Sequence, residues 1–254
     1  GWRWQRANRA LMRASRPATA DLRVVFAIPL ISRAKAADWD GVQARLAATL
    51  ATLRRQTDGR WMAIVCCQDY PESIAFGERV HFLRFDRSPA GYDNHAKTAA
   101  IRAWLARQGG AGYYFPLDAD DLIHPGLVAH VLQDDNRGGY RVDSGYLLDH
   151  ARLELAVLQP ADAAYPEATE FYRNCGSSSA LWFDFGSGAD CATLLSARGN
   201  HRKVGRNMAA YGVTIDTVPF HAAIYVMNHG DNLRQKRGLM AGKMKHFDLN
   251  PVRD

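Results

Sequence analysis

Three aspartates stand close together in the run Leu117-Asp118-Ala-Asp120-Asp121-Leu-Ile-His-Pro125. Carboxylates at this spacing repel one another and are costly to desolvate, so they need a cation, solvent or hydrogen-bond donors beside them. Mg²⁺ or Mn²⁺ meets that need, because such an ion takes one or two protein carboxylates and completes its shell with water and phosphate oxygens. The run therefore favours a metal site for a phosphate-bearing substrate. The alternative is a solvated turn in which Asp121 caps the following helix.

The elements around this cluster alternate between β-rich and helical stretches. Strands are predicted over 22–31, 61–68, 80–85 and 112–117, and helices over 40–56, over 93–108 and from Pro125 onward. This order is typical of an α/β fold with a mostly parallel central sheet and helices on both faces, which binds ligands beyond the carboxyl ends of its strands. The aspartates follow the fourth strand and so fall at that edge.

The second half of the chain has a different pattern. It predicts a hairpin over 140–148 and 152–158, a loop over 159–170, a strand over 178–183, helices over 191–198 and 201–211, and a strand over 215–227. No linker divides the chain. We expect one domain over 22–230, with halves 22–133 and 134–230, flanked by basic segments over 1–21 and 231–254.

The net charge of +6 is concentrated at the two ends of the chain. Residues 1–24 hold six arginines against one aspartate, whereas residues 25–230 hold 20 basic and 22 acidic side chains. A body with this slightly acidic balance does not favour nucleic-acid binding, and we expect no nucleic-acid partner.

The first segment has the pattern of an amphipathic helix. Five arginines fall within an arc of about 140° on a helical wheel, and the opposite face is less polar: Arg3, Arg6, Arg9, Arg13 and Arg16 against Trp4, Ala7, Leu11 and Ala14. Residues 1–20 could therefore lie on an anionic membrane surface. The alternative is a helix that packs against the body or a partner subunit.

No apolar run approaches the roughly 18 residues that a membrane span needs, and no stretch has the composition of a signal peptide. The four cysteines, at 66, 67, 175 and 191, form no C-x-x-C motif. We expect free thiols in a cytoplasmic protein, located at the inner face of the membrane if residues 1–20 bind lipid. A Cys175–Cys191 disulfide is the alternative.

Five motifs, in order over about residues 24–130, resemble the GT-A glycosyltransferases, and specifically the family-two group of inverting enzymes that use nucleotide-diphospho-sugars. They are Ile28-Pro29-Leu-Ile-Ser-Arg33, Leu50-Ala-Thr-Leu-Arg-Arg-Gln56-Thr57, a second strand that closes on Asp69, Gly91 with Ala96-Lys97-Thr98-Ala-Ala-Ile101, and Leu117 to Pro125. The resemblance implies a GT-A fold, with a nucleotide-sugar half at 22–133 and an acceptor half at 134–230.

The resemblance also implies roles for particular residues. Pro29 would line the base and ribose pocket, Asp69 would accept a hydrogen bond from the base, and Lys97 would approach the diphosphate or the base. Asp118 would contact the ribose and the metal shell, and Asp120 would bind the Mn²⁺ or Mg²⁺ itself. The run Ile224 to Asn232 resembles a closing motif of the family, which makes His229 a late ligand of the metal or diphosphate. Apart from the resemblance, the tail begins just after His229 and could lend Arg234, Lys236 or Arg237 to the same diphosphate.

The catalytic base is where this sequence departs from its relatives. The family usually carries Glu-Asp about a dozen residues before a glycine, whereas here the count back from Gly212 reaches Asn200-His201. A neutral imidazole can accept the proton of an acceptor hydroxyl near pH 7, so His201 is the first candidate. The carboxylates of Asp190 and Asp184 are the alternatives.

Together these features predict a metal-dependent glycosyltransferase. It would move a sugar from a nucleotide-diphospho-sugar, with UDP favoured, to a glycan or lipid-linked acceptor, and the resemblance implies inversion. One alternative is a nucleotide-sugar-binding protein of the same fold without turnover. A second is a haloacid-type phosphatase, which also carries D-x-D after a strand.

Overall fold

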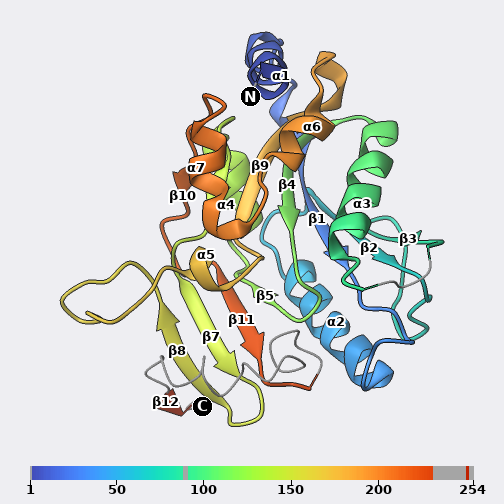
Figure 1. Cartoon of the computed structure of the whole chain (residues 1–254), viewed down its shortest axis with the longest axis vertical. Coiled ribbons are helices and arrows are strands. Elements are labelled where there is room, and N and C mark those ends of the chain that lie inside the picture. Colours follow the sequence, from blue (N-terminus) through green and yellow to red (C-terminus); the bar gives the residue numbers. More distant parts are fainter. Residues whose placement is uncertain (1, 88–90, 231–249, 252–254) are drawn as a thin grey trace.

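A seven-stranded sheet forms the centre of the computed structural model, which describes residues 2–87, 91–230 and 250–251 (Figure 1). Its strand order is β10-β6-β9-β4-β1-β2-β3. Four neighbouring strands run parallel: β3 (Val80–Arg84), β2 (Trp61–Cys67), β1 (Leu22–Pro29) and β4 (Ala111–Pro116). The strand β9 (Ser179–Asp184) runs antiparallel to β4, and β6 (Tyr140–Arg141) and β10 (Asp216–Thr217) complete the sheet. The predicted α/β class with a mostly parallel central sheet is confirmed.

The direction of the connections reverses between β1 and β4. The chain leaves β1 through α2 (Trp39–Arg54) to β2, then returns from β3 through α3 (Asn94–Gln108) to β4 on the other side of β1. Because such crossovers are right-handed, α2 and α3 cover opposite faces of the sheet. The carboxyl ends of β1 and β4 are therefore a topological switch point, where sheets of this type bind ligands.

Several shorter helices follow β4. They are α4 (Leu127–Asp134), α5 (Phe171–Asn174), α6 (Cys191–Ser196), α7 (Val204–Ala209) and 3₁₀ turns over Phe185–Ser187 and His201–Lys203; a further 3₁₀ turn, Thr19–Asp21, precedes β1. The predicted helices over 191–198 and 201–211 are thus present but shorter than expected.

A second, five-stranded sheet has the order β12-β8-β7-β11-β5. Its strands are β12 (Asn250–Pro251), β8 (Glu154–Leu158), β7 (Gly145–Asp149), β11 (Ala223–Met227) and β5 (Leu122–Ile123). Only β7 and β8 form the predicted hairpin, and the predicted strand over 215–227 is two strands in different sheets. Pro219 lies between them and has no N–H to continue a ladder.

The helix α1 (Trp2–Arg13) packs against the body of the chain. The Trp4 indole Nε1 donates to the Thr193 carbonyl at 3.1 Å and its ring stacks on Tyr211 at 5.2 Å, while Ala7 and Leu11 are buried. In this structure the apolar face that would lie on a membrane surface is covered by the body of the chain, so the expected membrane contact is not supported. The packing alternative holds, with the arginines on the exposed side. Within the described residues, no helix is both long and apolar enough to cross a bilayer.

All four cysteines are free and buried, so the alternative of a Cys175–Cys191 disulfide is wrong. The basic segment expected over 231–254, with Arg234, Lys236 and Arg237, lies outside the described residues apart from 250–251.

Gly112, in β4, lies directly opposite Arg23 of β1. Its φ is +148°, and a Cβ at this position would lie 1.9 Å from the Arg23 carbonyl oxygen. We expect Gly112→Ala to lower the free energy of unfolding by about 3 kcal/mol or more, because backbone atoms of two central strands would have to separate. Chemical denaturation measures this. Gly77→Ala is the matched control, since a Cβ there meets nothing within 4 Å. Equal stability of the two variants would contradict the tight β1–β4 contact.

Candidate active site

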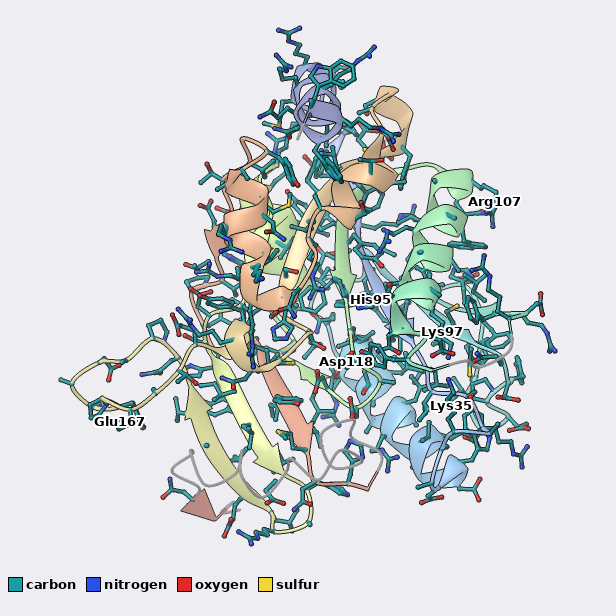
Figure 2. All side chains as sticks on the ribbon, in the orientation of Figure 1. Lys35, His95, Lys97, Arg107, Asp118 and Glu167 are labelled. Carbon is teal, nitrogen blue, oxygen red and sulfur yellow. The ribbon has the colours of Figure 1, made fainter. Side chains whose placement is uncertain are left out.

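Three strand ends meet at the switch point. Leu117 N donates to the Ala27 carbonyl at 2.9 Å, which ties the end of β4 to β1. Beyond β1, the backbone N–H of Arg33 donates to Asp69 Oδ2, beyond β2, at 2.7 Å. Figure 2 shows Asp118 just past the end of β4, with Lys35 and Lys97 to one side of it. The sheet therefore gathers the aspartate run, the turn after β1 and Asp69 along one edge.

The helix α2 anchors the aspartate run. Thr49 Oγ1 donates to the Ala119 carbonyl at 3.0 Å, and Thr52 Oγ1 accepts from Ile123 N at 3.2 Å. Gln56 bonds the His124 carbonyl at 2.9 Å through Nε2 and the Val128 N–H at 3.0 Å through Oε1. The motif over Leu50–Thr57 thus contributes to the geometry of the carboxylate loop without carrying chemistry of its own.

Asp121 is fully buried and joins three segments. Its carboxylate accepts from Ser177 Oγ at 2.6 Å, from Cys175 Sγ at 3.0 Å and from Val226 N at 3.2 Å. The expectation that Asp121 caps a helix is wrong, since the N-cap of α4 is Gly126 and no side chain caps this helix. Burial, and then the charges of Asp120 and Asp118, raises the pKa of Asp121 well above its usual range. Asp121 is therefore a structural residue that draws 175–177 and β11 towards the loop.

Asp120 and His229, 109 residues apart in sequence, meet in this structure. Asp120 Oδ2 lies 2.6 Å from His229 Nε2, and the His229 side chain is almost fully buried. His229 follows β11, which pairs antiparallel with β5 directly after the aspartates. The structure therefore brings together two of the three side chains that the sequence assigned to a metal.

The third, Asp118, is fixed at its backbone, where its N–H donates to Ser177 Oγ at 2.9 Å. Burial and the neighbouring Asp120 charge raise the pKa of Asp118 to about 6, and the positive charge of Arg198 opposes this shift. Gly176 lies so near that a Cβ on it would be 3.1 Å from Asp118 Oδ2. Among the residues that the structure describes, no three or more His, Cys, Asp or Glu side chains group as a metal would require. The predicted set of three ligands is thus not assembled here.

Arg198 is a residue that sequence reasoning missed. Its guanidinium donates to Ser179 Oγ at 2.8 Å and to the Gly176 carbonyl, so it holds the segment beside Asp118. In the sequence, Arg198 is one of many arginines and simply follows a short helix. Only the fold places its charge near the carboxylates.

The residues predicted for the nucleotide have different surroundings. Pro29 is buried at the end of β1, and Asp69 is partly exposed. Lys97 is fully buried: Nζ donates to the Leu30 carbonyl at 2.6 Å and lies 3.2 Å from Asp93 Oδ2. In this structure Lys97 is therefore not accessible to a ligand. Its bond to the Leu30 carbonyl holds the turn after β1 in place. Lys97 therefore supports the site without contacting a ligand itself.

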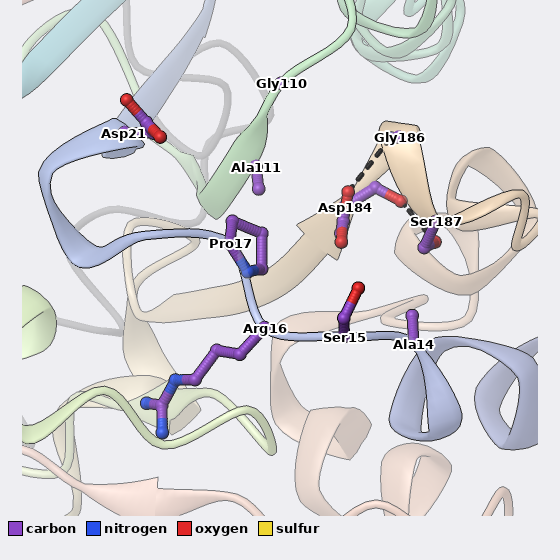
Figure 3. Close-up of a pocket in the computed structure, with 10 residues that line it drawn as sticks. All are labelled: Ala14, Ser15, Arg16, Pro17, Asp21, Gly110, Ala111, Asp184, Gly186 and Ser187. Atoms are coloured by element: carbon purple, nitrogen blue, oxygen red, sulfur yellow. Dashed lines mark hydrogen bonds between the residues drawn. The ribbon is translucent and has the colours of Figure 1, made fainter.

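Two of the three base candidates lie at the opposite edge of the sheet. Asp184 pairs with Ala111 at the start of β4, which at about 3.3 Å per residue puts it on the order of 20 Å from Asp118. Asp184 caps Gly186 N at 2.9 Å in a hollow whose other side includes Ser15 and Pro17 (Figure 3). Asp190 caps α6 through Thr193 N at 3.1 Å, and the Thr193 hydroxyl holds the pKa of Asp190 below its usual range. The structure does not bring either of them to the carboxylates.

The third candidate, His201, begins the 3₁₀ turn His201–Lys203, which contacts α5. Its Nδ1 bonds the carbonyl of Tyr172 in α5, the helix that leads directly into the 175–177 segment. A carbonyl can only accept, so Nδ1 carries the proton and Nε2 bears the lone pair of the neutral ring. That tautomer is the one a general base needs.

No family model matches this sequence, and no curated protein matches it. Among solved structures, one that is similar is described as a putative glucose-1-phosphate thymidylyltransferase from Bacillus anthracis in complex with a sucrose. The similarity has a TM-score of 0.44 at 12% sequence identity, over 90% of this chain and 98% of that chain. This likeness is too low to carry an argument about activity.

Proposed function

We propose that this protein is a metal-dependent glycosyltransferase that uses a nucleotide-diphospho-sugar. The observation that carries the proposal is the contact of Asp120 with His229 at the switch point of a mostly parallel sheet. The carboxylate oxygen of Asp120 and the imidazole nitrogen of His229 suit a divalent cation that keeps water and phosphate oxygens in its shell. The five motifs that resemble family-two GT-A enzymes supply further support.

On the donor side, Asp120 and His229 would hold Mn²⁺ or Mg²⁺, with Asp118 beside them. The ion would neutralise the charge that develops on the departing diphosphate. The guanidinium of Arg198 adds a fixed positive charge near Asp118. Asp69, which accepts from the Arg33 N–H, would also offer its carboxylate to the nucleotide base. UDP-sugars are the favoured donors, on the resemblance.

On the acceptor side, the transfer needs a base for the attacking hydroxyl of a glycan or lipid-linked acceptor. We expect His201→Asn to lower kcat on the order of 100-fold without changing donor affinity, because the asparagine Nδ2 keeps the bond to the Tyr172 carbonyl but provides no base. Steady-state kinetics with donor titration measures both values. An unchanged kcat in His201→Asn would show that His201 is not the base and that another residue has this role.

The proposal is tested with a panel of UDP-, GDP-, dTDP- and ADP-sugars, each with and without Mn²⁺. We expect one donor class to raise the Tm only with metal, and to be hydrolysed slowly in the absence of acceptor. A donor that shifts the Tm without being hydrolysed or transferred would identify the binding protein without turnover. Hydrolysis of simple phosphate esters, with no response to any nucleotide-sugar, would identify the phosphatase. Either outcome would overturn the transferase.

A further inference from the structure

The turn that follows β11 is built around a buried carboxylate. Asp149, at the end of β7, is 1% exposed and pairs with Met227 at the end of the parallel strand β11. Its Oδ1 accepts from the side-chain Nδ2 of Asn228 at 2.9 Å and from the backbone N–H groups of Ala151 and Arg152 at 3.0 and 3.1 Å. One oxygen thus fixes the β7–β8 turn and the residue just before His229.

Asn228 has left-handed backbone geometry, with φ of +64°. Asparagine is among the few residues that tolerate this region, and the bond to Asp149 holds its side chain in place. The backbone angles of Asn228 set the direction in which the chain leaves β11, and so decide where the next side chain points. That next side chain is His229, which reaches Asp120 at 2.6 Å.

A second contact, with His150, restricts the orientation of the His229 ring. The rings of His150 and His229 meet edge to face at 6.4 Å and 76°, and His150 N donates to the Met227 carbonyl at 2.9 Å. The end of β7 therefore touches the end of β11 at the backbone before His229, at the Asn228 side chain and at the imidazole itself. A turn needed only to close the sheet would not require the last of these.

We propose that Asp149 and Asn228 are positioning residues, which orient His229 towards Asp120 and thereby set the affinity of the site for a divalent cation. The proposal deepens the function proposed above and rests on it for the cation. The orientation of His229 in the protein without metal does not depend on that function. The two can therefore fail separately.

The first test measures binding of Mn²⁺ alone by electron paramagnetic resonance. Asn228→Gly permits the positive φ but removes the side-chain donor, and we expect affinity to fall about tenfold. Asp149→Asn keeps an oxygen acceptor and should retain most of the affinity. Leu153→Gly is the matched control: it lies at φ +55° in the β7–β8 turn, is 60% exposed, and should bind as the unaltered protein does.

The second test repeats Asn228→Gly in a His229→Ala background. A positioning role predicts no further loss of Mn²⁺ affinity there, whereas a role in folding alone predicts the same loss in both backgrounds. The latter result would overturn the proposal.

The third test observes the His229 ring by ¹⁵N NMR in the protein without metal. We expect the Nε2–H bonded to Asp120 to give a protected signal that Asn228→Gly loses while the rest of the spectrum keeps its dispersion. If the unaltered protein binds neither Mn²⁺ nor any donor, the proposed function fails, and this signal still decides the positioning role. An unchanged signal in Asn228→Gly would overturn it.

Discussion

Asp120→Asn is expected to lower the rate of sugar transfer on the order of 100- to 1000-fold. Asparagine keeps the shape of the side chain and one oxygen, but it removes the negative charge that would hold a divalent cation beside His229. The expected loss is in kcat/KM for the donor, together with the loss of the Mn²⁺-dependent rise in Tm.

The matched control is Asp86→Asn, a change of the same chemistry on an exposed surface. Asp86 is 79% exposed and pairs only with Arg84 among the ion pairs described. It should leave both readouts unchanged. If Asp120→Asn transfers sugar at the rate of Asp86→Asn, the carboxylate is not part of the reaction and the metal-dependent proposal fails.

Lys97→Met is expected to lower the free energy of unfolding by about 3 to 5 kcal/mol. The ammonium is 0% exposed, and its removal leaves the Leu30 carbonyl without its donor and deprives Asp93 of its buried partner. The methionine fills most of the space, so the loss reflects the charge and not a cavity. Chemical denaturation at pH 7 measures it.

Two further variants test whether the loss of stability comes from the buried Lys97–Asp93 pair or would follow the removal of any cation. Arg84→Met removes a cation from an ion pair that is 68% and 79% exposed, and should cost less than about 1 kcal/mol. Adding Asp93→Asn to Lys97→Met removes the unpaired charge, keeps an acceptor for Gln68, and should restore part of the stability. A loss with Lys97→Met no greater than that with Arg84→Met would contradict the role assigned to the buried pair.

The same pair predicts a dependence on pH. Burial alone would raise the pKa of Asp93, but the bond from Gln68 and the charges of Lys97 and Lys35 outweigh it and hold the pKa below its usual range. This carboxylate therefore stabilises the fold above about pH 4, and its contribution is lost as the pH falls through the folded pKa. The stability difference between the unaltered protein and Lys97→Met should be greatest near pH 7 and should shrink as the pH falls below about 4.

The sequence by itself predicted the elements that carry strong local signals. The apolar runs over 22–31, 61–68 and 112–117 predicted buried strands, and β1, β2 and β4 form the parallel centre of the sheet there. The aspartate run after the fourth strand predicted a site at the carboxyl edge, because parallel strands all end there. These inferences depend on the periodicity of apolar residues and on the order of the elements along the chain, and both can be determined from the sequence alone.

The tertiary structure alone decided which side chains meet. Asp118 and Asp121 are the same residue type in one short run. In the structure, Asp121 accepts from three donors in distant segments, whereas Asp118 lies near the charge of Arg198. Lys97 can be buried because the turn after β1 provides the Leu30 carbonyl as an acceptor for its ammonium group.

Asp184 fell at the wrong edge because β9 runs antiparallel to β4, a pairing that no local pattern encodes. The covered face of α1 has the same cause: amphipathic periodicity shows that a helix will bury one side, while the surface that buries it is formed by residues nearly 200 positions away, as in the bond from Trp4 to Thr193.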